Sequence, residues 1–192
     1  MKFNKSPRNL YQFFSSLPGL LLVLTILNLL LFGIMQLVSF RATGGGFPLD
    51  DSWIHQTYAK GIAQTGSWAY GLNGRSAGST SPLWTLFLVP GHLLSSSNPF
   101  GWTFTITWLF SAALLLLSTV LLNRLVDHNL GLTAIFGAAL SMEWHLLWAA
   151  GSGMEILLLG AGFIAILYLL KYKTHYALIG LLTGSLVFVR LE

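Results

Sequence analysis

Apolar and polar positions fall in long blocks along this chain, a pattern typical of membrane-spanning helices. Six apolar blocks occupy residues 17–40, 82–94, 103–122, 130–149, 155–170 and 176–189. A spanning helix needs about 20 apolar residues, and block 82–94 is too short, with Pro90-Gly91 interrupting its end. We therefore predict an all-α integral membrane fold in which five blocks span the bilayer and 82–94 lies in the interface.

The composition agrees with this class. Hydrophobic residues make up 54% of the 192 positions and charged residues 8%, with a mean hydropathy of +0.69, whereas soluble domains carry about 25% charged residues. The net charge of +4 does not indicate nucleic-acid binding, because the Lys and Arg residues mostly flank apolar blocks, where they act as orientation signals. The chain has no cysteine, which excludes disulfides and thiolate metal sites.

The basic residues orient the chain. The first block follows several of them, as in a signal sequence, but its full spanning length and the lack of a small-residue cleavage site predict an uncleaved helix. If block 82–94 crossed the membrane, four of the ten Lys and Arg residues would lie inside; if it lies in the interface, six do. The six are Lys2, Lys5, Arg8, Arg124, Lys171 and Lys173. The N-terminus is therefore predicted to be cytoplasmic.

This orientation defines the predicted domain organisation, a single transmembrane module over residues 1–192 of the cytoplasmic (inner or plasma) membrane. Residues 1–16 form the cytoplasmic N-terminus, 17–40 the first spanning helix, 41–102 an outer loop with interfacial helices, and 103–192 four further spanning helices. The outer loop contains the longest polar passage of the chain, residues 47–84. We expect the function to reside there.

Within the loop, one segment has the pattern of an amphipathic helix. Asp51 or Ser52 is placed to cap its start, apolar side chains recur every four residues at 54, 58 and 62, and Gly66 ends it. The polar residues fall on other faces: His55, Gln56, Lys60 and Gln64. We predict a helix of about fifteen residues that lies on the bilayer surface.

Two of the six acidic residues of the chain, Asp50 and Asp51, are adjacent at the start of this helix. A helix N-terminus favours an anion, so the pair is suited to accept a proton or to hold a divalent cation. The simpler interpretation is a capping pair on an exposed loop. Spacing alone does not separate the two.

Each of two other acidic residues has both a structural and a functional interpretation. Glu155 precedes an apolar block, where it either stabilises a helix dipole or lines a site. Glu143 lies within block 130–149, where it marks an ion path or pairs with His145 or an Arg. Asn28 is expected to bond another helix. The five His residues lack metal-ligand spacing, and no Gly-x-Ser-x-Gly motif occurs.

Several short motifs together resemble GT-C membrane glycosyltransferases, which use polyprenyl-phosphate sugars, and above all actinobacterial arabinofuranosyltransferase-like proteins. Protein O-mannosyltransferases and lipid A aminoarabinose transferases share the acidic pair. The matching elements are LDDSWI at 49–54, YA at 58–59, GSTSPLW at 78–84, GME at 153–155 and, loosely, RLE at 190–192. Leu191 replaces the usual proline of the last element. Members of the family run to several hundred residues, so the resemblance covers their N-terminal part, and we expect a truncated chain or one completed by another.

The resemblance implies an enzyme of the cell envelope that moves a sugar from a polyprenyl-phosphate donor to a hydroxyl of a glycan, lipid or protein acceptor at the outer membrane face. It implies Asp50 as general base, Asp51 as its partner or a cation ligand, and Glu155 lining the same cavity. Three outer cations are candidates for holding the lipid phosphate: Lys60, Arg75 and Arg190. No cofactor is required by the sequence, and a divalent cation is an option.

Two other classes of protein fit the same residues. A transporter or channel subunit would use Glu143 and Glu155 as an ion or proton path, and would tolerate loss of Asp50. An inert membrane assembly partner would tolerate loss of either group.

Overall fold

Every regular element that the structure describes is an α-helix, which confirms the predicted all-α class. The structure is a computed structural model and describes residues 12–70, 76, 78–95, 98–172 and 175–190. Its helices are α2 (Leu17–Thr43), α3 (Asp50–Thr65), α4 (Pro82–Leu94), α5 (Phe100–Leu125), α6 (Leu130–Ser141), α7 (Trp144–Ser152), α8 (Ile156–Lys171) and α9 (Tyr176–Val187).

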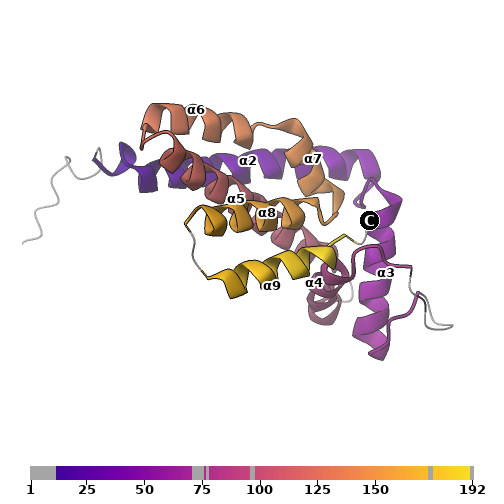
Figure 1. The fold of residues 1–192 in the computed structure, drawn as a ribbon. Helices are drawn as coiled ribbons and strands as arrows, with labels where there is room; N and C mark the ends of the chain where they lie inside the picture. The colour runs from indigo at the N-terminus through magenta and orange to yellow at the C-terminus, as the bar shows by residue number, and fades with distance from the viewer. Residues whose placement is uncertain (1–11, 71–75, 77, 96–97, 173–174, 191–192) are drawn as a thin grey trace, which may run out of the picture.

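The helices form a bundle with a cap at one end. Figure 1 shows α2, α5, the α6–α7 pair, α8 and α9 running between the same two ends of the molecule, with α3 standing across one end beside α4. The last described residues lie at that same end. Three further segments therefore lie at the α3–α4 end: the start of α5, the α7–α8 junction and the end of α9.

Two apolar clusters hold this arrangement. The first joins α2, α5, α7 and α8 through Phe32, Leu114, Ala149, Ala150, Leu157 and Ala161. The second fixes the end cap, with Ala59 of α3, Trp84 and Leu88 of α4, and Ile106 of α5. Phe110 packs against both clusters. Burial of these side chains stabilises the fold by about 1.5–3 kcal/mol for each large residue relative to exposure in water. Because Phe110 contacts both clusters, the cap and the bundle are packed into one core.

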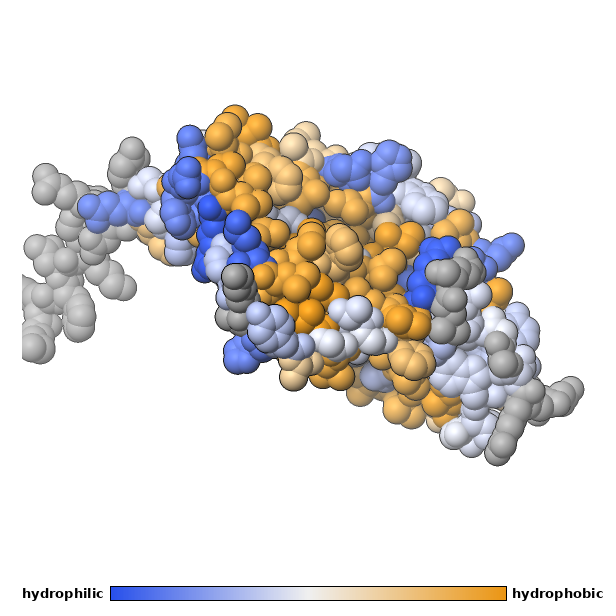
Figure 2. All heavy atoms as spheres, in the orientation of Figure 1, coloured by the Kyte–Doolittle hydropathy of each residue, from blue (hydrophilic) through white to orange (hydrophobic). Residues whose placement is uncertain are grey.

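The outer surface of the bundle indicates an integral membrane protein. Figure 2 shows hydrophobic residues gathered in a band over the middle of the helices, with hydrophilic residues at both ends. Two helices, α2 and α5, are long and apolar enough to cross a membrane, and α6 with α7 forms a third candidate if their 45° bend lies within one span. The five spans expected from the sequence are thus reduced to two or three by length and composition, because α8 and α9 have only 16 and 12 residues.

The break between α6 and α7 corrects the placement of Glu143. We expected this residue inside a continuous apolar helix, but α6 ends at Ser141 and Glu143 is the N-cap of α7. Its carboxylate accepts a hydrogen bond from the Leu146 backbone N–H at 2.9 Å and lies 2.7 Å from His145 Nδ1. The pairing with His145 is confirmed, and helix capping accounts for the acid.

The prediction for Asn28 is also confirmed. Its amide Nδ2 donates to Ser111 Oγ at 3.1 Å, joining α2 to α5, and the Asn28 side chain is buried. Polar pairs between helices that face lipid have this stabilising role.

Candidate functional site

The polar side of α3 faces the protein. The helix spans Asp50–Thr65 and ends at Gly66, which has a left-handed backbone with φ of 68°, as the sequence predicted. Its buried residues include Ser52, His55, Gln56 and Ala59, which share one helical face. The sequence predicts an amphipathic helix with His55, Gln56, Lys60 and Gln64 on its polar faces. Lys60 and Gln64 are exposed, but His55 and Gln56 are buried against other segments, which corrects the prediction for these two residues.

The predicted caps of α3 are also wrong. The N-cap is Leu49, and no side chain caps the free backbone N–H groups. Asp51 is exposed, and Ser52 is fully buried, where its hydroxyl donates to the Ser152 carbonyl at 2.5 Å. That bond connects the first turn of α3 to the end of α7, a hundred residues later in the chain.

His55 occupies the centre of the buried face. It is 0% exposed, with Nδ1 3.3 Å from Ser79 Oγ and 3.4 Å from Thr85 Oγ1. Its Nε2 lies 3.6 Å from Glu155 Oε2, which is longer than a hydrogen bond, and has no hydrogen-bond partner among the described residues. Burial lowers the pKa of His55 from 6.5 to about 4, although the nearby Asp51 charge opposes the shift. His55 is therefore neutral at pH 7.

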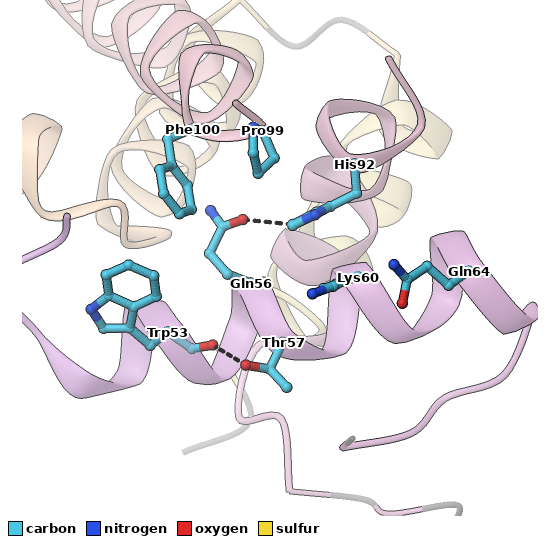
Figure 3. Close-up of a pocket in the computed structure, with 8 residues that line it drawn as sticks. All are labelled: Trp53, Gln56, Thr57, Lys60, Gln64, His92, Pro99 and Phe100. Atoms are coloured by element: carbon cyan, nitrogen blue, oxygen red, sulfur yellow. Dashed lines mark hydrogen bonds between the residues drawn. The ribbon is translucent and has the colours of Figure 1, made fainter. Parts of the chain in front are cut away.

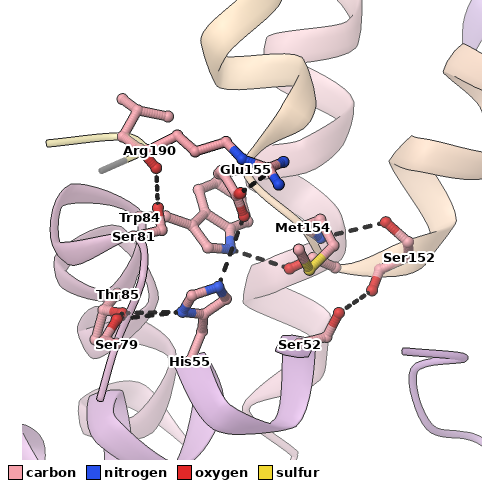
Figure 4. A network of polar contacts seen from close by, with 12 residues as sticks. Ser52, His55, Ser79, Ser81, Trp84, Thr85, Ser152, Met154, Glu155 and Arg190 are labelled. Atoms are coloured by element: carbon pink, nitrogen blue, oxygen red, sulfur yellow. Dashed lines mark hydrogen bonds and ion pairs between the residues drawn. The ribbon is translucent and has the colours of Figure 1, made fainter. Parts of the chain in front are cut away.

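Glu155 is a buried acid between two basic side chains (Figure 4). It precedes α8, is 2% exposed, and lies 3.8 Å from an Arg190 guanidinium nitrogen through Oε1. Arg190 is 44% exposed, so this ion pair reaches from the interior to the surface. With this pairing, Arg190 can bind an anionic or hydroxyl-bearing group at the protein surface while Glu155 fixes the guanidinium from the interior.

The chain after α9 is held in place by the start of α4. The Leu83 backbone N–H donates to the Phe188 carbonyl at 2.8 Å, and the Ser81 hydroxyl donates to the Val189 carbonyl. Ser81 is the N-cap of α4 and Pro82 its first residue, which leaves these donors outside the helix ladder. The two bonds position Arg190 beside Glu155.

Trp84 and Gly153 complete the site. Trp84 is fully buried, and its indole Nε1 donates to the Gly153 carbonyl at 3.0 Å. Gly153 ends α7 with φ of 76°, and a Cβ there would lie 2.5 Å from the Phe47 ring. Only glycine satisfies both the backbone angle and the close approach at this position, so the turn that presents Glu155 depends on it.

Gly153→Ala is expected to reduce the free energy of unfolding by about 2–5 kcal/mol, the sum of a left-handed backbone and an overpacked ring contact. The measurement is unfolding in mixed micelles followed by tryptophan fluorescence. Gly66→Ala is the matched control, since Gly66 has φ of 68° with open space around its Cβ position, and it is expected to lose only about 1–2 kcal/mol. Equal losses in the two variants would contradict the role of the Phe47 contact.

The sequence-predicted residues separate into two groups in the structure. Glu155 and Arg190 meet, and Asp51 is near enough for its charge to act on His55. Asp50 is exposed on the first turn of α3. Lys60 instead lines a cavity at the contact of α3 with α4 and the start of α5, and Arg75 lies outside the described residues.

His55 is the site residue that sequence reasoning missed. The apolar pattern predicts the buried face at residues 54, 58 and 62, and His55 falls on a different face of the helix. The signal was present in the spacing 52, 55, 56 and 59, which places small and polar residues on one helical stripe. A stripe of that kind is suited to burial when polar partners from other segments meet it.

Metal binding has little support from side chains alone. Within the described ranges, no group of three or more His, Asp or Glu residues is placed to hold a metal ion. A divalent cation at Asp50 and Asp51 would need further oxygen ligands from substrate or water.

Comparisons of the chain with protein-family models, with curated proteins and with solved structures give no match. The functional argument therefore depends on the site itself.

Proposed function

We propose that this chain is a membrane glycosyltransferase module that moves a sugar from a polyprenyl-phosphate donor to a hydroxyl acceptor at the membrane surface. One observation carries the proposal: the motifs quoted for the resemblance, far apart in sequence, are joined by direct contacts at one end of the bundle. Two contacts join residues of the motifs themselves, Trp84 with Gly153 and Glu155 with Arg190. Three more join a motif residue to a residue directly beside another motif: Ser52 with Ser152, Ser81 with Val189, and Glu155 with His55.

The location suits such a donor. The site lies at an end of the apolar band, where hydrophilic residues begin (Figures 1 and 2). A polyprenyl-phosphate sugar has its tail in the bilayer and its phosphate at headgroup level, so its reactive carbon is at this depth. Arg190, partly exposed and held by buried Glu155, is placed to bind the phosphate, and its planar guanidinium suits that oxyanion.

In the proposed reaction, Asp50 accepts the proton of the acceptor hydroxyl as its oxygen bonds to the anomeric carbon of the sugar. The bond between that carbon and the phosphate oxygen breaks, and polyprenyl phosphate leaves with both electrons of the bond. Arg190 stabilises the phosphate charge, and Asp51 orients Asp50 or holds a divalent cation. His55, neutral and buried, lies beside Glu155.

The membrane arrangement is part of the proposal. The five expected crossings correspond to α2, α5, α6–α7, α8 and α9, which run between the two ends of the bundle, with the N-terminus in the cytoplasm and the α3–α4 cap outside the cytoplasmic membrane. A full span needs about 20 residues. The residues that flank α8 and α9 would therefore have to complete these two crossings.

The orientation is tested by single cysteines in this cysteine-free chain. Ser76→Cys, at the capped end, is expected to react with a membrane-impermeant maleimide applied outside intact cells, and Lys171→Cys, at the last turn of α8, only after permeabilisation. Both positions are exposed in the structure. The reverse labelling pattern would invert the topology and place the site in the cytoplasm.

The function is tested with the full chain in its native membranes and a panel of polyprenyl-phosphate sugars labelled in the sugar. Transfer of label to an endogenous acceptor, with release of polyprenyl phosphate in equal amount, is the expected result. Membranes lacking the chain are the control. If no donor in the panel is consumed above that control, the proposal is wrong.

A further inference from the structure

A second site lies apart from the contacts around Glu155. A cavity of about 340 Å³ is lined from α3 by Trp53, Gln56, Thr57, Lys60 and Gln64, from α4 by His92, and from the start of α5 by Pro99 and Phe100 (Figure 3). Its volume is at the lower end of the range of about 300–1,000 Å³ found for small-molecule sites. The ligand it fits is thus no larger than one or two rings.

One end of the cavity is aromatic. Trp53 and Phe100 lie together there, with ring centroids 5.4 Å apart and planes at 89°. The Trp53 indole N–H donates to the Phe47 carbonyl at 3.2 Å, and Phe47 also packs edge-on against both rings. The indole is therefore held in a fixed orientation while 41% of the residue remains exposed. A rigid aromatic face attracts the partly positive C–H groups of a ring ligand.

The other end carries hydrogen-bonding groups in a defined orientation. Gln56 is buried, and its Nε2 donates to Thr103 Oγ1 at 2.7 Å, which leaves Oε1 to accept from His92 Nε2 at 2.9 Å. His92 then carries its proton on Nε2 and presents Nδ1 as an acceptor. Burial and the Lys60 charge both lower the pKa of His92, which keeps the imidazole neutral.

Charge narrows the class of ligand. The lining residues include one cation, Lys60, and no carboxylate, so a cationic ligand is disfavoured. A phosphate site would be expected to combine several cations or free backbone N–H groups. Here the Gln64 amide and the His92 imidazole line the cavity beside a single ammonium, while Gln56 and Thr57 bond to groups of the protein. Neutral donors and acceptors opposite an aromatic face suit a ring that bears many hydroxyls.

We propose that this cavity, the α3–α4–α5 pocket, binds one saccharide unit, with the C–H face of the sugar against Trp53 and Phe100 and its hydroxyls toward His92, Lys60 and Gln64. The saccharide is neutral or acidic. The inference does not depend on the transferase proposal, since it concerns binding by residues outside the Glu155 contacts, and it holds equally for a protein that only retains a glycan at the membrane.

The test is saturation-transfer NMR with the full chain in phosphatidylcholine nanodiscs and methyl glycosides of mannose, glucose and arabinofuranose, with glucosamine as the cationic comparison. At least one methyl glycoside is expected to bind, and more tightly than glucosamine. Trp53→Leu is expected to weaken binding about tenfold, and Gln64→Leu, at an exposed position, about fivefold. The matched controls, Trp144→Leu and Lys171→Met, change exposed residues elsewhere and should leave binding unchanged.

Three results would overturn the proposal. One is the absence of binding by every glycoside to the unmodified chain, and another is equal binding by the Gln64→Leu variant, whose fold is not at risk. The third combines two observations: phosphatidylglycerol in the discs displaces the glycoside, and Lys60→Met restores glycoside binding in the presence of that lipid. This result would identify the pocket as a lipid headgroup site. Asp50→Asn should keep binding intact, so failure of transfer and failure of saccharide binding are distinguishable.

Discussion

Asp50→Asn is expected to reduce sugar transfer by about 10²–10⁴-fold, the usual contribution of a general base, while leaving membrane insertion and unfolding unchanged. The side chain is exposed at the first turn of α3 and makes no capping hydrogen bond. Asparagine has nearly the same shape and cannot take up the acceptor proton. The measurement is the initial rate of label transfer from the donor identified in the panel, at saturating acceptor.

Glu143→Gln is the matched control for Asp50→Asn. Glu143 pairs with His145 at the other end of α7 from Gly153, about 15 Å away by helical rise, and its change is expected to leave transfer unaltered. A chain that keeps near-normal transfer without Asp50 would refute the assigned base. A chain whose ion or proton flux in proteoliposomes depends on Glu143 instead would belong to the transporter class.

Asp51→Asn separates the two roles left to the second acid. If Asp51 holds a divalent cation with Asp50, its loss is expected to raise the cation concentration needed for half-maximal transfer. If it only orients Asp50, transfer falls without any change in cation dependence. A chelator titration of both proteins measures the difference.

Much of the fold could be predicted from apolar blocks because bilayer burial imposes a simple rule on sequence. The block 82–94 matches α4 residue for residue, and the start of the first block matches α2. The break in block 130–149 could not be predicted from hydropathy, since the short passage from Ser141 to His145 lies between two apolar runs. At the break, the Leu146 N–H donates a local capping bond to the Glu143 carboxylate, which competes with the helix ladder.

The candidate site was harder to predict, because its burial depends on partners that are distant in sequence. Ser52, His55 and Gln56 look like a water-facing stripe until Ser152, Ser79 and Thr103 are placed opposite them. Ser52, Gln56 and the Nδ1 side of His55 find partners on other segments, which offsets the free-energy cost of burying them. The pairing of Glu155 with Arg190 likewise joins residues that are distant in sequence, so hydropathy alone could not predict it.

The buried network also makes the protein sensitive to acid. The pKa of His55 is about 4 in the folded chain and 6.5 in the unfolded chain. As pH falls below 6.5 the unfolded state takes up this proton first, so the free energy of unfolding decreases until the pH reaches about 4. Between pH 7 and pH 5 the expected loss from this one residue is about 2 kcal/mol.

His55→Gln should remove that loss, because glutamine retains a polar contact to Ser79 and Thr85 but does not titrate. Unfolding in mixed micelles at pH 7, 6 and 5 measures the free energy of the two proteins, and the unmodified chain should fall by about 2 kcal/mol more than the variant. Parallel curves for the unmodified chain and His55→Gln would mean that His55 is hydrated in the folded protein, and Glu155 would then lack the neutral, water-free neighbour that the proposed site requires.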